Sequence, residues 1–226
     1  MTAQILFVTG TDTDVGKTIA TAAIAATLAG RAGARVAVYK PVQTGVRADE
    51  PGDIDVVRHL SGVTSAHEGI RLRRPMAPVA AAHREAARLP TLAEHAARIE
   101  DLAGGHEHVL VEGAGGLLVH LDQTHTIADL AGHFGARGAV IVVCRSGLGT
   151  LNHTELTIQA LAQRRLPVAG LVIGSWPQRP DDIALDNRGY LSARPVPLLG
   201  AIPERAAQWE PGVFRSHAAS WFTGPL

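Results

Sequence analysis

Short apolar runs rich in valine, isoleucine and leucine recur through the chain, and segments with helical patterns separate them. Six such runs occur, at residues 4–9, 36–39, 108–111, 139–143, 168–173 and 196–199. Most are continuously apolar, which is typical of parallel strands covered on both faces. Their alternation with helices predicts βαβ units and an α/β layered fold with a mostly parallel central sheet. Because no repeat, low-complexity tract or linker divides the chain, we expect one domain over residues 1–226.

The segments between these runs carry helix start and stop signals. Thr91 and Glu94 have the spacing of a capping box, and Thr126 opens another helical segment. Helices are predicted over residues 18–31 (closing at Gly33), 53–62, 91–103, 126–135 and 150–165. The stretch 174–194 is polar and rich in turn residues, so it is interpreted as an excursion from the domain.

The composition excludes several classes of protein. Lys and Arg number 21 and so do Asp and Glu, and this zero net charge gives no support to a nucleic-acid binder. The single cysteine, Cys144, cannot form an internal disulfide. No apolar run approaches the length of a membrane span, and the N-terminus lacks a basic region and a cleavage signal. We therefore expect a cytoplasmic protein with no membrane and no nucleic-acid partner.

The loop after the first apolar run has the pattern of a phosphate-binding P-loop. Residues 10–18 read GTDTDVGKT, with Gly10 one position earlier than the strict pattern requires. In such loops backbone N–H groups surround phosphate oxygens at a helix N-terminus. Lys17 would reach the β- and γ-phosphates and the Thr18 hydroxyl would bind Mg²⁺. Asp12 and Asp14 are either turn residues or contacts for a substrate amine, and the sequence leaves both interpretations open.

Two further strand ends carry charged residues. Lys40 follows the second apolar run, and Glu112 follows the third, before a glycine-rich segment. Ligands of parallel sheets bind at the carboxyl ends of the strands, so both side chains are expected near Lys17. A second lysine there would neutralise charge during phosphoryl transfer, and Glu112 is placed to hold a metal. Of the aspartates between these strands, Asp53 is predicted to cap a helix and Asp55 to bind the metal.

Five segments carry a resemblance to a known family. They are residues 10–18 (GTDTDVGKT), 39–45 (YKPVQTG), 111–116 (VEGAGG), 147–153 (GLGTLNH) and 198–203 (LLGAIP). Together, and in this order, they resemble the dethiobiotin synthetases. The resemblance implies a P-loop NTPase-like three-layer sandwich, the fold group of the septum-site ATPase MinD and the nitrogenase iron protein.

The resemblance also implies a reaction. Members of this family use ATP and Mg²⁺ to carboxylate 7,8-diaminononanoate with CO2 and to close the ring of dethiobiotin, a step of biotin synthesis. A carbamate and a carbamic–phosphoric anhydride are the implied intermediates, and ADP and phosphate are the other products. The family acts as a homodimer with the substrate site at the subunit interface, which is expected here too.

Site residues follow from matching positions. Lys40, Lys17 and Thr44 match catalytic positions, and Thr18, Asp55 and Glu112 match the metal site, although Asp49 or Asp53 could replace Asp55. Nucleotide contacts are expected at Thr13, Asp14, Val15, Gly16, Lys17, Thr18, Gly174, Ser175, Pro203, Glu204 and Arg205. Substrate contacts are expected at Thr13, Lys40, Thr44, Gly116, Gly147, Leu148, Gly149, Thr150, Leu151 and Asn152, with Tyr190 a weaker candidate.

One position departs from the family. Where relatives commonly carry an Asn-Asp pair whose amide contacts adenine, this chain has Gly174 and Ser175. The departure suggests weak base recognition and acceptance of nucleoside triphosphates other than ATP.

Two alternatives share the P-loop. A cobyrinate-type amidoligase would need a further glutaminase domain with a catalytic cysteine, and Cys144 lies inside an apolar run. A MinD- or ParA-like regulatory ATPase usually has a second lysine early in the P-loop, and residues 11–15 contain none.

Overall fold

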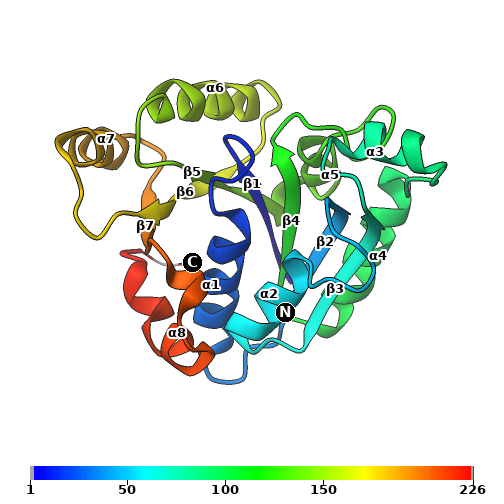
Figure 1. The fold of residues 1–226 in the computed structure, drawn as a ribbon, viewed down its shortest axis with the longest axis horizontal. Helices are drawn as coiled ribbons and strands as arrows, with labels where there is room; N and C mark the ends of the chain where they lie inside the picture. Colours follow the sequence, from blue (N-terminus) through cyan, green and yellow to red (C-terminus); the bar gives the residue numbers. More distant parts are fainter. Residues whose placement is uncertain (1–2, 225) are drawn as a thin grey trace.

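A computed structural model describes residues 3–224 and 226 of the chain. Its centre is a seven-stranded sheet with the order β3-β2-β4-β1-β5-β6-β7, and all the paired strands run parallel. In Figure 1 the sheet crosses the picture from β3 on the right to β7 on the left. The strands are β1 Gln4–Gly10, β2 Val36–Thr44, β3 Ser65–Leu72, β4 His108–Gly116, β5 Gly138–Cys144, β6 Val168–Trp176 and β7 Leu198–Pro203.

Helices cover both faces of this sheet. They are α1 Lys17–Ala29, α2 Asp53–Ser61, α3 Pro78–Glu85, α4 Leu92–Gly105, α5 Ile127–His133, α6 Thr150–Gln163, α7 Asp182–Ser192 and α8 Pro211–Ala218. Three short 3₁₀ turns are η1 Gly135–Arg137, η2 Ala206–Gln208 and η3 Ala219–Trp221. None of the helices in the described part of the chain is long and apolar enough to cross a membrane.

Successive residues of the central strand supply two separate cores. Ile5 and Phe7 of β1 pack on the face covered by α3, α4, α5, α6 and α7, whereas Leu6 and Val8 pack under α1, α2 and α8. This alternation explains why the strand is continuously apolar from Ile5 to Val8, because both of its faces are buried. The prediction of an α/β three-layer sandwich with a parallel sheet is therefore confirmed.

The sequence-based predictions missed one strand, β3, and three helices, α3, α7 and α8. β3 occupies one edge of the sheet, and its sequence SAHEGIRL mixes polar and apolar residues, so it lacks the continuous apolar pattern. The stretch interpreted as an excursion contains the end of β6 and the whole of α7, which Asp181 caps by accepting the Ala184 N–H at 2.8 Å. Helix α1 ends at Ala29, four residues before Gly33.

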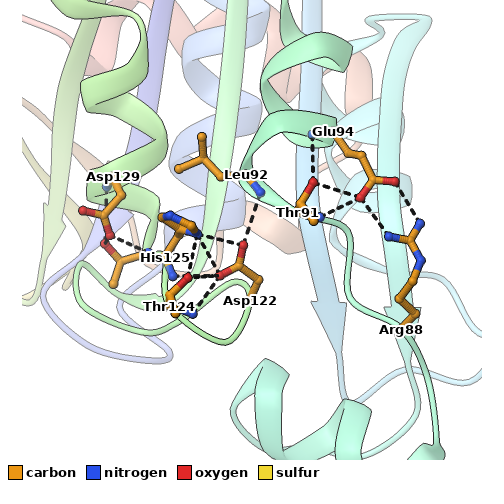
Figure 2. Close-up of polar contacts among 9 residues, drawn as sticks. Arg88, Thr91, Leu92, Glu94, Asp122, Thr124, His125 and Asp129 are labelled. Carbon is orange, nitrogen blue, oxygen red and sulfur yellow. Dashed lines mark hydrogen bonds and ion pairs between the residues drawn. The ribbon is translucent and has the colours of Figure 1, made fainter.

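Figure 2 shows two helix starts that lie beside each other. At α4, Thr91 and Glu94 form the predicted capping box, and Arg88 donates two hydrogen bonds of 2.8 Å to the Glu94 carboxylate. At α5, Thr126 and Asp129 form a second capping box. We call these four residues, together with Arg88, Asp122, Thr124 and His125, the capping cluster. Asp122 joins its halves by accepting the N–H groups of Leu92 (3.2 Å) and His125 (2.7 Å).

Candidate active site

A cavity of about 460 Å³ opens at the carboxyl ends of β1, β2 and β4, which are neighbours in the sheet. Lys17 and Thr18 enter it from the loop after β1, Lys40 from β2, Asp53 from the start of α2 and Glu112 from β4. We call it the phosphate cavity. The sheet order thus brings together charged residues that are up to 95 positions apart in the sequence.

The loop after β1 has a backbone that only certain residues tolerate. Asp14 and Gly16 both have positive φ, 55° and 93°. A Cβ on Gly16 would lie 2.5 Å from the carbonyl oxygen of Gly174, and a Cβ on Gly174 would lie 2.0 Å from that of Val15. The loop therefore packs directly on the end of β6, and glycine is required on both sides of this contact.

Lys17 is nearly buried and points back over its own loop. Its Nζ donates to the Asp12 carbonyl oxygen at 2.9 Å, and the residue is 8% exposed. Burial lowers the pKa of Lys17, against the opposing charge of Glu112, and the nearby Lys40 lowers it further. Asp12 behaves as a turn residue, because its carboxylate accepts the Thr13 N–H at 2.7 Å and pairs with Arg145 at 3.3 Å.

Lys40 lies between two carboxylates at the floor of the cavity. Its Nζ is 2.9 Å from Glu112 Oε1 and 2.5 Å from Asp53 Oδ2, and its side chain is 4% exposed. Burial alone would lower the pKa of Lys40, but Glu112 and Asp53 more than offset that effect, so its pKa is raised. Lys40 therefore stays protonated in the cavity.

Glu112 is fully buried, yet one of its oxygens is unpaired. Oε1 accepts hydrogen bonds from Thr18 (2.8 Å) and Lys40 (2.9 Å), whereas Oε2 has no partner among the described residues. A buried carboxylate oxygen without a donor is costly unless a ligand satisfies it. The described residues contain no group of three or more His, Cys, Asp or Glu side chains suited to a metal. Two carboxylates and a hydroxyl nevertheless fit Mg²⁺, which usually keeps waters and binds phosphate oxygens.

Asp53 does not cap α2, although the sequence predicts that it does. Gly52 is the N-cap of α2, and the Asp55 carboxylate accepts the Gly52 N–H at 2.9 Å in a capping box. Asp55 also pairs with Arg58 and Arg71, away from the lining of the cavity. Asp53 is the first helical residue and faces Lys40. Asp49 pairs with Arg47 and is exposed. These three aspartates lie within seven positions of one another, and their sequence pattern does not distinguish their roles.

Four of the remaining predicted substrate residues line three different hollows, and those of residues 148–152 line none of the three. Thr44 lines the phosphate cavity, and Thr13 lies between it and a second cavity of about 460 Å³ that includes Gly116. Gly147 belongs to a third hollow. Leu148 is 82% exposed and Asn152 is exposed, whereas Thr150 is buried and donates to the Arg145 carbonyl oxygen at 2.7 Å. The N-cap of α6 is Gly149.

The third hollow, of about 330 Å³, contains several of the expected nucleotide contacts. Asp14, Val15, Ser175 and Glu204 line it, whereas Pro203 and Arg205 are not among its lining residues. Glu204 accepts the Gln178 N–H at 3.0 Å. Gly174 lies beneath Val15 as described above. The lining therefore includes the Ser175 side chain and no side chain from the glycine before it.

The structure adds two residues that the sequence did not single out. Gln43 lines the phosphate cavity and accepts the Asp53 N–H, and Arg145 donates to the Thr13 carbonyl oxygen at 2.9 Å. Both lie at or just after the carboxyl end of a strand, which is the signal that had identified Lys40 and Glu112. Tyr190 donates to Glu155 at 3.2 Å on the surface formed by α6 and α7.

Comparison with known proteins gives consistent results along the whole chain. A family described as an AAA domain matches residues 4–210. An ATP-dependent dethiobiotin synthetase of Parafrankia sp. is 50% identical over 96% of this chain and 91% of its own length. Those of Streptomyces coelicolor and Rhodococcus jostii are 49% and 47% identical, over 98% and 97% of this chain and 93% and 94% of their own lengths.

Solved structures extend the likeness in fold. The cell-division ATPase MinD of Pyrococcus furiosus matches with a TM-score of 0.57 over 97% of this chain and 95% of its own, at 19% identity. MinD of Pyrococcus horikoshii, complexed with Mg-ADP, matches with a TM-score of 0.53 over 98% of this chain and 87% of its own, at 21% identity. At such identities the likeness concerns the fold alone.

Proposed function

This chain belongs to the family of ATP-dependent dethiobiotin synthetases, and we propose that it makes dethiobiotin from 7,8-diaminononanoate, CO2 and ATP, for biotin biosynthesis. The observation that carries the proposal is the phosphate cavity, where Lys40 lies between Glu112 and Asp53 beside the P-loop lysine Lys17. Such a site suits transfer of a phosphoryl group to an anionic acceptor.

The reaction proceeds in three balanced steps. One amine of the substrate adds to CO2 and loses a proton, which gives a carbamate. A carbamate oxygen then attacks the γ-phosphorus of ATP, the bond to the ADP oxygen breaks, and a carbamic–phosphoric anhydride forms. The second amine attacks the carbonyl carbon, loses a proton and expels phosphate, which closes the ureido ring.

The chain's own residues hold and neutralise the reacting groups. Backbone N–H groups of residues 13–18 bind the phosphates at the start of α1. Lys17 and Lys40 supply the two cations that stabilise negative charge on the transferred phosphoryl group. Lys40 is fixed for this purpose, because Glu112 and Asp53 hold its Nζ from two directions. Thr44, at the end of β2, is placed to orient the substrate beside it.

Thr18, Glu112 and Asp53 are the residues that would hold Mg²⁺. Support comes from the unpaired Glu112 oxygen and from the shared lining of one cavity. When bound, the ion neutralises charge on the β- and γ-phosphates. We therefore propose Asp53, and not Asp55, as the aspartate of the Mg²⁺ site.

We propose relaxed recognition of the nucleotide base. The hollow next to the P-loop offers Ser175 and Glu204, and the residue before Ser175 is a glycine without a side-chain amide. Comparable kcat/KM with ATP, CTP and GTP is expected. A preference for ATP of about a hundredfold or more, equal to roughly 2.7 kcal/mol, would contradict this proposal.

We propose that the enzyme is a homodimer through the surface near α6. Leu148, Leu156 and Leu118 are 82%, 56% and 51% exposed, and Leu118 and Leu156 line the second cavity. Exposed large apolar side chains gathered at one place typically mark an interface. A partner seated there would complete the substrate site with residues 147–152. Leu148→Glu should then shift the protein to monomer in analytical ultracentrifugation, and an unchanged dimer would count against this surface.

The decisive assay measures products. Dethiobiotin and ADP should form in equal amounts from 7,8-diaminononanoate, bicarbonate, Mg²⁺ and ATP, and neither should form when the diamine is omitted. ADP release that is independent of the diamine would instead favour a regulatory ATPase. We expect this chemistry in the cytoplasm, where ATP is supplied.

A further inference from the structure

We propose that Gln43 is a positioning residue, whose carboxamide fixes the first turn of α2 so that Asp53 reaches Lys40 and the Mg²⁺ position. The proposal depends on the proposed function in one respect only, which is the role of Asp53 at Lys40 and the Mg²⁺ position. The contacts that carry it lie entirely within the chain.

Gln43 is a buried amide with two backbone partners. It lies three residues after Lys40 on β2, is 4% exposed and lines the phosphate cavity. Its Oε1 accepts the Asp53 N–H at 2.9 Å, and its Nε2 donates to the Thr44 carbonyl oxygen at 3.0 Å. These two bonds fix which way the amide faces, because only the oxygen can accept from Asp53.

Asp53 depends on such a contact because of its place in the helix. The first N–H groups of a helix have no partner within it. Here the Gly52 N–H is taken by Asp55 at 2.9 Å, and the Asp53 N–H is taken by Gln43. The Asp53 side chain is 34% exposed, and among the described residues its one ion pair is with Lys40. The direction of the Asp53 side chain therefore depends on the position of its own backbone, which the hydrogen bond to Gln43 fixes.

The neighbouring strand holds the same turn from the other side. Arg71 of β3 is the register partner of Gln43, and it donates to the Glu50 carbonyl oxygen at 2.6 Å and to Asp55 at 3.3 Å. A Cβ on Gly52 would lie 2.8 Å from Arg71 Nη2 and 3.1 Å from Gln43 Oε1. Gly52 therefore lies close to both side chains, and a larger residue there would have to displace their ends.

A small displacement of Asp53 is expected to reduce the reaction rate. Its carboxylate is one of two that hold Lys40, and the other, on Glu112, is fully buried and cannot follow. A displacement of about 1 Å at such a site costs on the order of a hundredfold in rate. Losing the Gln43 acceptor would permit that displacement, since the Asp53 N–H would then turn toward water.

The test is a double-mutant cycle with Gln43→Met, Asp53→Asn and the pair. Methionine has a similar length and offers no oxygen acceptor. In the Gln43→Met protein, the Mg²⁺ concentration that half-saturates binding of a non-hydrolysable ATP analogue should rise about 10- to 100-fold, and kcat should fall. In the Asp53→Asn background the same substitution should change both by no more than about twofold, within ordinary additivity error.

Arg58→Met is the matched control. Arg58 stabilises the same helix through Asp55 (2.9 Å) and the Ala66 carbonyl oxygen (2.7 Å), and it does not line the cavity. Its loss should lower Tm and leave the Mg²⁺ dependence unchanged. If Gln43→Met does not fold, Gln43→Leu repeats the comparison.

An unchanged Mg²⁺ dependence in Gln43→Met would overturn the proposal. So would an equal loss in the Asp53→Asn background, because Gln43 would then act by another route. Wild-type protein that binds the nucleotide with Mg²⁺ but forms no dethiobiotin would refute the proposed function and leave this positioning role intact.

Discussion

A hollow of about 580 Å³ lies beside the capping cluster, and it is larger than the phosphate cavity, at about 460 Å³. In the capping cluster (Figure 2), each carboxylate accepts N–H groups of the chain itself. In the phosphate cavity, a fully buried carboxylate keeps one oxygen unpaired. Cavity volume therefore does not distinguish the two places, whereas the partners of their charged groups do.

The charged groups of the two regions also differ in what surrounds them. At the capping cluster, Arg88 and the Thr91 N–H hold the pKa of Glu94 at about 2, on a surface open to water. In the phosphate cavity, burial and the nearby charge of Lys40 lower the pKa of Lys17, against the opposing charge of Glu112. Two cations in one buried cavity are the expected property of a site that binds an anion.

Removing one cation from each region gives the largest expected contrast. Lys40→Ala should reduce kcat by about 10²- to 10³-fold, because a charge opposite the transferred phosphoryl group is lost. Its free energy of unfolding should fall by about 3–5 kcal/mol with the fold retained, because Glu112 loses its buried cation. Steady-state kinetics and urea unfolding measure both. Arg88→Ala should leave kcat unchanged, and near wild-type turnover in Lys40→Ala would remove the distinction between the regions.

Removing one hydroxyl from α1 tests the cavity more finely. Thr18→Val deletes the group that donates to Glu112 at 2.8 Å and that would bind Mg²⁺. The apparent affinity for Mg²⁺ with nucleotide should fall about 10- to 100-fold, as measured by isothermal titration calorimetry. Thr27→Val on the same helix removes a hydroxyl that donates only to the Ala23 carbonyl oxygen. It should behave as wild type, and equal effects of the two substitutions would count against the assignment of Thr18.

A pH titration tests the interior behind the capping cluster. His95 of α4 is 1% exposed and its Nδ1 lies 2.7 Å from the Tyr39 hydroxyl, and burial lowers the pKa of His95 from 6.5 to about 4. The unfolded chain therefore binds this proton first as pH falls. Stability from the neutral ring is complete above pH 6.5 and is lost progressively between pH 6.5 and about 4, by on the order of 3 kcal/mol.

Urea unfolding at a series of pH values measures this effect. His95→Gln keeps a polar partner for Tyr39 and should flatten the curve over that range. A variant whose pH dependence matches wild type would show that other groups are responsible.

The capping cluster itself should give the smallest effect. Thr91→Ala removes the N-cap of α4 and should lower the free energy of unfolding by about 1 kcal/mol, with a Tm shift of about 2–4 °C. Turnover should not change, which activity assays at a temperature well below Tm can verify. A loss of activity in this variant would mean that the two regions communicate.

Local signals explain how much of this arrangement was predictable. The capping boxes depend on residues three positions apart, so Thr91 with Glu94 identified the start of α4 correctly. The P-loop depends on nine consecutive residues, and Lys40 and Glu112 follow apolar runs that became β2 and β4. These features can be recognised within single segments of the sequence, because short-range hydrogen bonds and burial on both faces determine them.

The predictions from sequence failed where contacts with residues elsewhere in the fold determine the local structure. Edge strand β3 is specified by pairing with β2, and its own residues are only partly buried. Asp53 and Asp55 have the same chemistry two positions apart. The N-cap falls on Gly52, and so Asp55 turns back to the helix start while Asp53 faces Lys40.

The sequence by itself determined a parallel α/β sheet, a P-loop at the end of its first strand, and charged residues at the ends of two further strands. The tertiary structure alone decided which of those charges meet, since the strand order β2-β4-β1 places Lys40, Glu112 and Lys17 at one edge. It also decided that Gln43 accepts the Asp53 N–H and that Arg71 pairs with Asp55. Helix and strand preferences act over a few residues, whereas the direction of a side chain into a cavity depends on backbone contacts between segments far apart in the chain.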